Sequence, residues 1–61
     1  MKTEYAQYLA NINEKYQAAI PAIKRWAYSL TCQQLLDETR KHGVQHISDL
    51  IHVKAKRAAM A

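Results

Sequence analysis

The fold of this chain is set largely by one segment, YAQYLANINEKYQAAIPAIKRWAYSL, which spans residues 5–30. Apolar residues recur in it with alternating spacings of four and three, and they are Tyr5, Leu9, Ile12, Tyr16, Ala19, Ile23, Trp26 and Leu30. On an α-helix this spacing places all of them on one narrow stripe, as in the seam of a coiled coil. Such a stripe has to be covered by another helix. The segment therefore predicts one long helix and at least one helical partner for it.

Pro21 lies in the middle of this segment and bears on whether the helix is continuous. A proline inside a helix removes one backbone hydrogen bond and collides with the carbonyl group four residues earlier, here that of Gln17. The chain can form one long kinked helix from near Thr3 to about Ser29, or two helices that break before Pro21. The spacing continues through Pro21 in the same phase, and no Gly, Asn or Ser beside it favours a loop. We therefore expect the kinked helix, with Thr3 as its N-cap.

A second helix is predicted from Cys32 to just before Gly43. Thr31 and Gln34 have the spacing of a capping box, in which each side chain binds a free backbone N–H group of the other residue. Gly43 is the only glycine of the chain, and it follows three basic residues. A glycine after a basic last turn is typical of a helix C-terminus, because the chain then turns through a left-handed conformation.

A third helix is predicted from roughly Gln45 or Ser48 to the late fifties. We expect its last residues, 58–61, to fray because nothing is available to cover them. The outward-facing residues of this helix are predicted to be Asp49, His52, Lys56 and Arg57. The second and third helices are expected to fold as a hairpin onto part of the long helix through Leu35, Leu36, Ile47, Leu50 and Ile51.

Length and composition indicate a single all-α domain over residues 1–61. One Gly, one Pro and no Phe form a helix-rich composition, and no window shows the alternation of a half-buried strand. A chain of this length buries only about 60% of the surface that its unfolded form exposes, so its own core is marginal. Disulfide bonds cannot reinforce that core, because Cys32 is the only cysteine. Oligomerisation is the remaining way to stabilise the chain.

We therefore expect a helical homodimer, or a higher helical oligomer, that covers the stripe. The predicted interface residues are Tyr5, Leu9, Ile12, Tyr16, Ile23 and Trp26. Leu9→Asp or Ile12→Asp is expected to dissociate the dimer and to unfold the chain, since no stable monomer is expected. The pattern leaves open whether the helices pair in parallel or antiparallel.

The sequence predicts no catalytic activity and no cofactor or metal. A single glycine cannot form a phosphate-binding loop, and the adjacent Asp37 and Glu38 diverge around a helix instead of converging as an acid–base pair. Cys32 lies at a helix N-terminus, where a lowered pKa could make it a nucleophile, but we interpret it as a buried or half-buried small side chain. His42 and His46 are four residues apart, yet Gly43 interrupts the helix that would align them.

The alternative to a purely protein-binding role is DNA binding by a helix-turn-helix-like hairpin over residues 35–57. The order of helix, short turn with Gly43, and helix with basic residues fits that motif. Asp49, near the start of the second helix of the hairpin, would repel phosphate groups. Residues that would contact nucleic acid in this alternative are Lys54, Lys56 and Arg57. The net charge of +4 is only a mild bias toward anionic partners.

Location can be inferred from what the sequence lacks. The longest apolar run, residues 18–23, is interrupted by Pro21 and is too short to span a membrane. The first residues lack the apolar core of a secretory signal. We therefore expect a cytoplasmic protein.

The run MKTEYAQYLANINEKYQAAIPAIKRWAYSL, followed by TCQQLLDETRKHG, resembles the small helical proteins of lambdoid bacteriophages. These are encoded in the early region between the recombination and excision genes. The resemblance rests on length, helical composition and general character, so it transfers no functional residue. It implies a dispensable accessory protein, made early in infection in the host cytoplasm, that acts through protein contacts on host physiology or on the choice between lysis and lysogeny.

Overall fold

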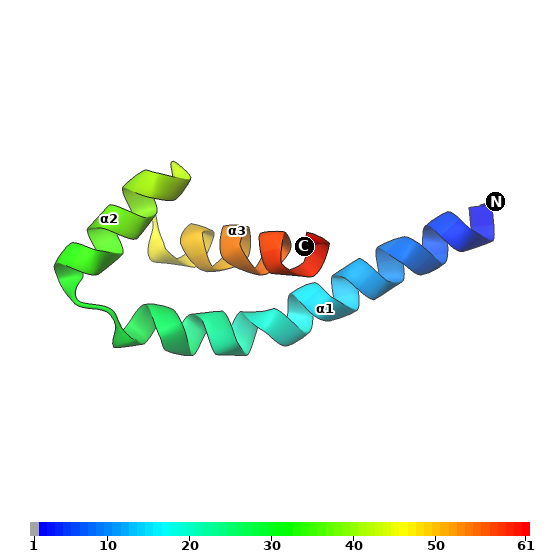
Figure 1. Ribbon diagram of the computed structural model, residues 1–61, viewed down its shortest axis with the longest axis horizontal. Helices are drawn as coiled ribbons and strands as arrows, with labels where there is room; N and C mark the ends of the chain where they lie inside the picture. Colours follow the sequence, from blue (N-terminus) through cyan, green and yellow to red (C-terminus); the bar gives the residue numbers. More distant parts are fainter. Residues whose placement is uncertain (1) are drawn as a thin grey trace.

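The computed structural model describes residues 2–61 and consists of three helices, which measure 46 × 20 × 16 Å together. They are α1 (Lys2–Ser29), α2 (Cys32–His42) and α3 (Ile47–Met60) (Figure 1). No strand occurs in the described part of the chain. The all-α prediction is therefore confirmed, and the boundaries of α2 and α3 lie close to the predicted ones.

Helix α1 runs through Pro21 as one continuous helix, as expected from the uninterrupted spacing. Its axis changes direction between the blue N-terminal part and the green C-terminal part (Figure 1). A proline is the usual cause of such a bend, because its ring displaces the preceding turn. One detail of the prediction is wrong: the helix already includes Lys2, so Thr3 lies inside the first turn and not at the N-cap.

Both ends of α2 are closed by the local interactions that the sequence predicts. The Gln34 backbone N–H donates to Thr31 Oγ1 at 3.2 Å, and the Thr31 N–H donates to Gln34 Oε1 at 3.0 Å. At the other end Gly43 has φ 69° and ψ 28°, in the left-handed region. The N–H groups of Gly43 and Val44 donate to the carbonyls of Arg40 and Thr39, which completes a Schellman motif.

Helix α3 packs antiparallel against the C-terminal half of α1, and α2 joins the two at one end (Figure 1). The buried residues at this contact are Ala27, Leu50, Ile51, Ala55 and Ala59. Alanine at three of these positions lets the two helices approach closely. Leu50 is the one large side chain of the described residues that is fully buried, so the core is thin. A thin core agrees with the marginal stability expected for so short a chain.

Three expectations about this contact are wrong. Helix α3 continues to Met60, and Ala59 is only 4% exposed, so the end of α3 is covered where fraying was expected. The reason is that α1 extends beyond α3 and offers a surface to its last turn (Figure 1). Leu36 and Ile47, predicted to lie in the hairpin contact, are instead exposed. Helix α2 makes a much smaller contact with α3 than α1 does, which leaves both residues uncovered.

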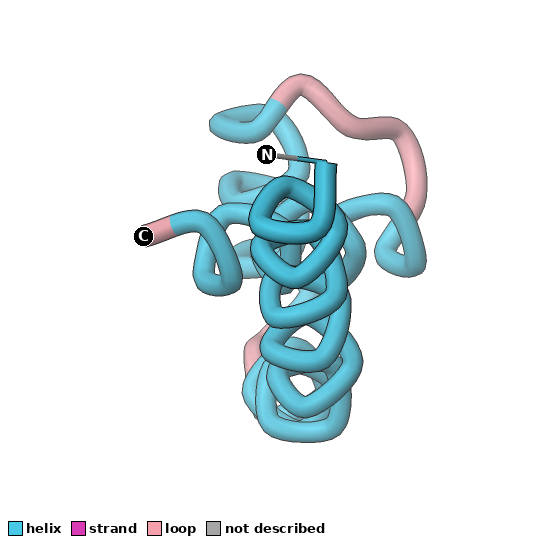
Figure 2. Tube along the Cα trace, turned by 90° about the vertical axis from the view of Figure 1, so that its right-hand side faces the viewer, coloured by secondary structure: helices cyan, strands magenta, loops and turns pink. Residues whose placement is uncertain are grey.

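The structure therefore has two parts, which we call the body and the arm. The body comprises residues 16–61, in which the C-terminal half of α1 is covered by α3. The arm is residues 3–15, the half of α1 that extends past α3 (Figure 1), and Figure 2 views the molecule from the N-terminal end of α1. None of the helices within residues 2–61 combines the length and apolar character needed to cross a membrane.

Candidate interaction surface

The arm carries three exposed large apolar side chains at one end of the molecule. Tyr5, Tyr8 and Leu9 are 64%, 57% and 46% exposed, and Ile12 is half-buried. Tyr5, Leu9 and Ile12 belong to the apolar stripe, and Tyr8 lies directly beside it. Exposed tyrosines and leucines that adjoin on one helix face are typical of contact surfaces, because they bring a large area at low entropic cost. The arm is therefore the first candidate for an interaction site.

The remaining predicted interface residues, Tyr16, Ile23 and Trp26, lie in the body and are half-buried. Each of them faces α3: Tyr16 contacts His52, Trp26 contacts Lys54, and Ile23 lies beside Ala58. The stripe is thus divided, since α3 covers its C-terminal half within the same chain. The six residues predicted to form one interface are not equally available. Tyr5 and Leu9 are exposed, and the other four are half-buried, namely Ile12, Tyr16, Ile23 and Trp26.

His52 connects α3 to the bend region of α1. Its Nδ1 is hydrogen-bonded to the Tyr16 hydroxyl group, and the centroids of the two rings lie 5.8 Å apart with an interplanar angle of 30°. His52 is exposed, as predicted, and its ring also contacts α1 through Tyr16. Thirty-six residues separate the two partners, and no local sequence signal reports a contact at that distance.

A charged cluster joins all three helices on the opposite side of α3. Glu38 Oε2 lies 3.5 Å from Lys54 Nζ and 3.5 Å from His42 Nε2. Arg57 Nη1 donates to His42 Nδ1 at 3.1 Å, and Lys54 Nζ lies 3.9 Å from the centroid of the Trp26 ring. Because a guanidinium group can only donate, His42 Nδ1 is the acceptor in the contact with Arg57. The cluster thus fixes α2 and α3 on α1.

This cluster was not recognised from the sequence, although one signal was present. Glu38 and His42 are four residues apart on α2 and therefore share a face. Their partners on α3 could not be identified in the same way, because that requires knowing how α2 and α3 are placed. Arg57 is exposed, as predicted, and also contacts His42 on α2.

The three basic residues of the DNA-binding alternative lie in two places. Lys54, half-buried beside Trp26, and Arg57, exposed and in contact with His42, line one cleft. Lys56 is exposed and borders a different one. The exposed face of α3 also carries Asp49 in its first turn. The geometry does not gather the three side chains into one basic surface.

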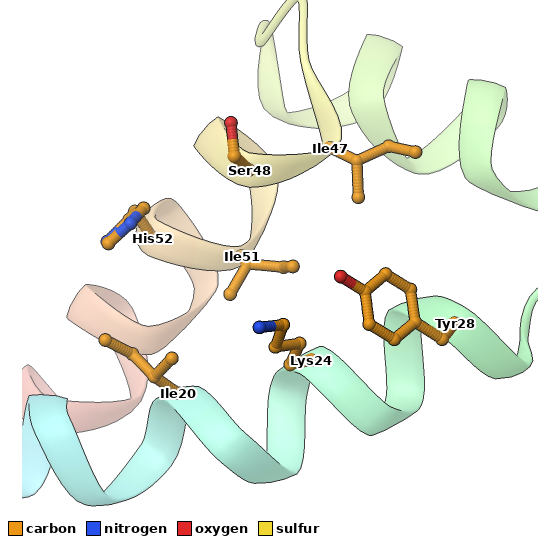
Figure 3. A pocket seen from close by; sticks show the side chains of 7 residues that line it. All are labelled: Ile20, Lys24, Tyr28, Ile47, Ser48, Ile51 and His52. Carbon is orange, nitrogen blue, oxygen red and sulfur yellow. The ribbon is translucent and has the colours of Figure 1, made fainter.

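An apolar cleft of about 410 Å³ lies between α1 and α3 near the turn that leads into α2. Figure 3 shows Ile20, Lys24 and Tyr28 on α1 facing Ile47 and Ile51 on α3. The only ionisable groups that line it besides the Tyr28 phenol are those of Lys24 and His52. These groups do not form an acid–base pair with a nucleophile, so the cleft suggests no chemistry.

Cys32 is exposed at the start of α2, and the expectation that it is buried or half-buried is wrong. It borders an open groove of about 540 Å³ whose apolar wall includes Leu35, Leu36 and Ile47. Burial was expected because cysteine is usually a small core residue; here the first turn of α2 borders an open groove instead of a packed core. Among residues 2–61, no group of three or more His, Cys, Asp or Glu side chains is placed to hold a metal ion.

Comparison with known proteins adds no further assignment. No family model matches the chain, and neither a curated protein nor a solved structure is significantly similar to it.

Proposed function

We propose that this chain is a small non-enzymatic interaction protein that acts through protein–protein contacts of its arm, and that it assembles as a helical homodimer. The observation that carries the proposal is the exposure of Tyr5, Tyr8 and Leu9 on a helix half that no other part of the described chain covers. An isolated stretch of about 12–15 helical residues is only marginally stable in water. A partner that covers the arm stabilises it, and the first available partner is a second copy.

The biological role that we propose follows from the resemblance to small helical proteins of lambdoid phages. It is that of an early accessory factor that modulates host physiology or the choice between lysis and lysogeny. The thin core and the open arm support a role in binding, because both gain stability when a partner is bound.

DNA binding receives less support. Two of its three basic residues, Lys54 and Arg57, already have partners within the body, and Asp49 lies at the end of α3 where phosphate groups would approach. We expect no binding to duplex DNA at ~50 mM salt, where phosphate contacts are strong. Binding whose affinity falls steeply with added salt would favour the alternative.

The proposal is tested by the molecular mass in solution. An interface confined to the arm is small, so we expect self-association with a dissociation constant on the order of micromolar. Sedimentation or light scattering should therefore give a dimer at high concentration and a monomer on dilution. Leu9→Asp should give the monomer at every concentration, because it places a charge in the apolar contact. Since α3 packs on α1 within one chain, we expect this monomer to stay folded, in place of the unfolding expected from the sequence. Gln7→Asp, on an exposed side of the arm away from the stripe, is the matched control and should dimerise.

The same pair of variants tests the biological role. Expression of the wild-type chain in a bacterial host should change its growth or the frequency of lysogeny. Leu9→Asp should abolish that effect and Gln7→Asp should retain it. An effect that survives in Leu9→Asp at equal protein levels would show that the arm is not the functional surface.

A further inference from the structure

From the start of the arm to Tyr16, the stripe has the same spacing and the same order of residue types in both chain directions. Tyr5, Leu9, Ile12 and Tyr16 are spaced by four, three and four residues, with an aromatic residue at each end and two aliphatic residues between them. A helix of opposite direction therefore repeats both the spacing and the residue types. If two arms lie antiparallel, Leu9 faces the second copy's Ile12, and Tyr5 faces the second copy's Tyr16.

The position of α3 decides against a parallel pair. Beyond Tyr16 the stripe is already covered, since Ala27 is fully buried under α3 and Trp26 lies against Lys54. In a parallel pair the two bodies would lie side by side. Each α3 would then occupy the part of its own α1 stripe that the second copy's α1 would have to contact. Antiparallel arms place the two bodies at opposite ends, so the α3 helices do not meet. Antiparallel helix dipoles also attract each other.

At each end of this arrangement the second copy's Tyr5 approaches Tyr16, which is half-buried and also contacts His52 on α3. The last turn of α3 lies against α1 near the junction of arm and body (Figure 1), and Met60 on that turn is 65% exposed. The arm of one copy thus ends where the body of the other begins.

The residues that flank the stripe are compatible with this arrangement. Along one edge lie Ala6 and Asn13, and along the other lie Tyr8 and Lys15; all four are exposed. In an antiparallel pair, Ala6 lies beside the second copy's Asn13, and Tyr8 lies beside the second copy's Lys15. A small side chain thus adjoins an amide group, and a tyrosine ring adjoins an ammonium group. The second pair has the composition of a cation–π contact. Like charges do not meet in either pair.

We infer that two copies of this chain associate through antiparallel arms, with Leu9 packed against the second copy's Ile12 at the centre. This inference rests on the self-association proposed above and adds its orientation and register. The occupant of the arm is then a second copy, and a different protein bound there would have to displace it.

The orientation can be measured by pulsed electron paramagnetic resonance on spin-labelled protein. In a Cys32→Ser background, a single cysteine is introduced by Glu4→Cys or by Asn11→Cys. These two exposed positions are seven residues apart and lie on the same side of α1. With antiparallel arms, moving the label from residue 11 to residue 4 adds about 18 Å of separation along the axis, at ~1.5 Å per residue in each chain. The mean distance between labels should therefore be about 10 Å longer for Glu4→Cys once the lateral spacing of the helices is included.

Each other result has a distinct meaning. Equal distances at the two positions in a dimeric sample would overturn the antiparallel orientation and leave the self-association intact. The absence of dipolar coupling in a sample that sediments as a monomer would overturn the proposed dimer itself. Adding Leu9→Asp to either labelled variant should abolish the coupling; coupling that persists would place the contact elsewhere on the molecule.

The register can be checked by cross-linking in the same Cys32→Ser background. Ala6→Cys combined with Asn13→Cys should give a covalent dimer with a short bis-maleimide, because the two positions adjoin across antiparallel arms. Gln7→Cys combined with Glu14→Cys has the same spacing on the outer side of the arm and should give far less. Similar yields from both pairs would overturn the register.

Discussion

In the C-terminal half of α1 the apolar stripe packs against α3, whereas in the N-terminal half the same stripe is open to solvent. Trp26 and Ile23 are half-buried and Ala27 is fully buried, while Tyr5 and Leu9 are exposed. Both halves have the same spacing and the same helical conformation. The difference between them comes from the length of α3, which ends at Met60 and cannot reach the arm.

This comparison shows what a periodic apolar pattern specifies. The pattern indicates that one face of a helix must pack against another helix. It does not indicate whether that helix belongs to the same chain or to another chain. In this protein α1 combines both. Its C-terminal half packs against α3 of the same chain, and we expect its N-terminal half, before the bend near Pro21, to pack against another chain.

The largest expected effect is a difference in stability between two leucine variants. The sequence predicts that both leucines are covered by apolar contacts. Leu50→Ala should lower the free energy of unfolding by about 2–5 kcal/mol, because Leu50 is fully buried and the thin core cannot fill the cavity. Leu9→Ala should change the free energy of unfolding by less than about 0.5 kcal/mol when the protein is dilute enough to be monomeric. Chemical denaturation followed by circular dichroism measures both. Equal losses under those conditions would mean that the arm is covered within one chain.

The next prediction compares two alanines of α1. Ala27→Leu should destabilise the chain by about 1–3 kcal/mol, because Ala27 is fully buried where α3 approaches and a larger side chain forces the helices apart. Ala10→Leu, at an exposed position of the arm, serves as the control and should leave the melting temperature nearly unchanged. A tolerated leucine at residue 27 would contradict the close approach of α1 and α3.

The smallest effect concerns two lysines of α3. Lys54→Met removes the ammonium group that lies over Trp26 and beside Glu38, and it should cost about 0.5–1 kcal/mol. Lys56→Met removes an exposed charge and should have no measurable effect on stability. Thermal unfolding of the two variants at low and high salt measures the difference. If both lysines behave alike, the contact between Lys54 and α1 contributes nothing to the body.

The parts of the fold that could be predicted depend on residues close together in the chain. The capping box of Thr31 and Gln34 and the left-handed turn at Gly43 each require only a few neighbouring residues, and both were predicted correctly. Continuity through Pro21 followed from the unbroken phase of the stripe. The exposure of Cys32 could not be predicted in this way, because it depends on where α1 and α3 lie relative to the first turn of α2.

The apolar stripe could be predicted, but which part of it is exposed could not. The stripe predicts Tyr5 and Leu9 as contact residues, and both are exposed; it also includes Ile23 and Trp26, which α3 covers. The contact of Tyr16 with His52 and the cluster around Glu38 join residues from different helices. Such contacts depend on how whole helices are placed relative to one another. The spacing of residues within one helix does not indicate that placement.

Local chemistry along the chain was sufficient to specify three helices, their ends and an apolar stripe, because helix propensity, capping and periodicity act over a few residues. The packing of α3 on α1 then decided which half of the stripe is closed and which is open. The physical reason is geometric: helix α3 is half as long as α1, with 14 residues against 28, so it can cover only one half. The arm is the part that α3 leaves exposed.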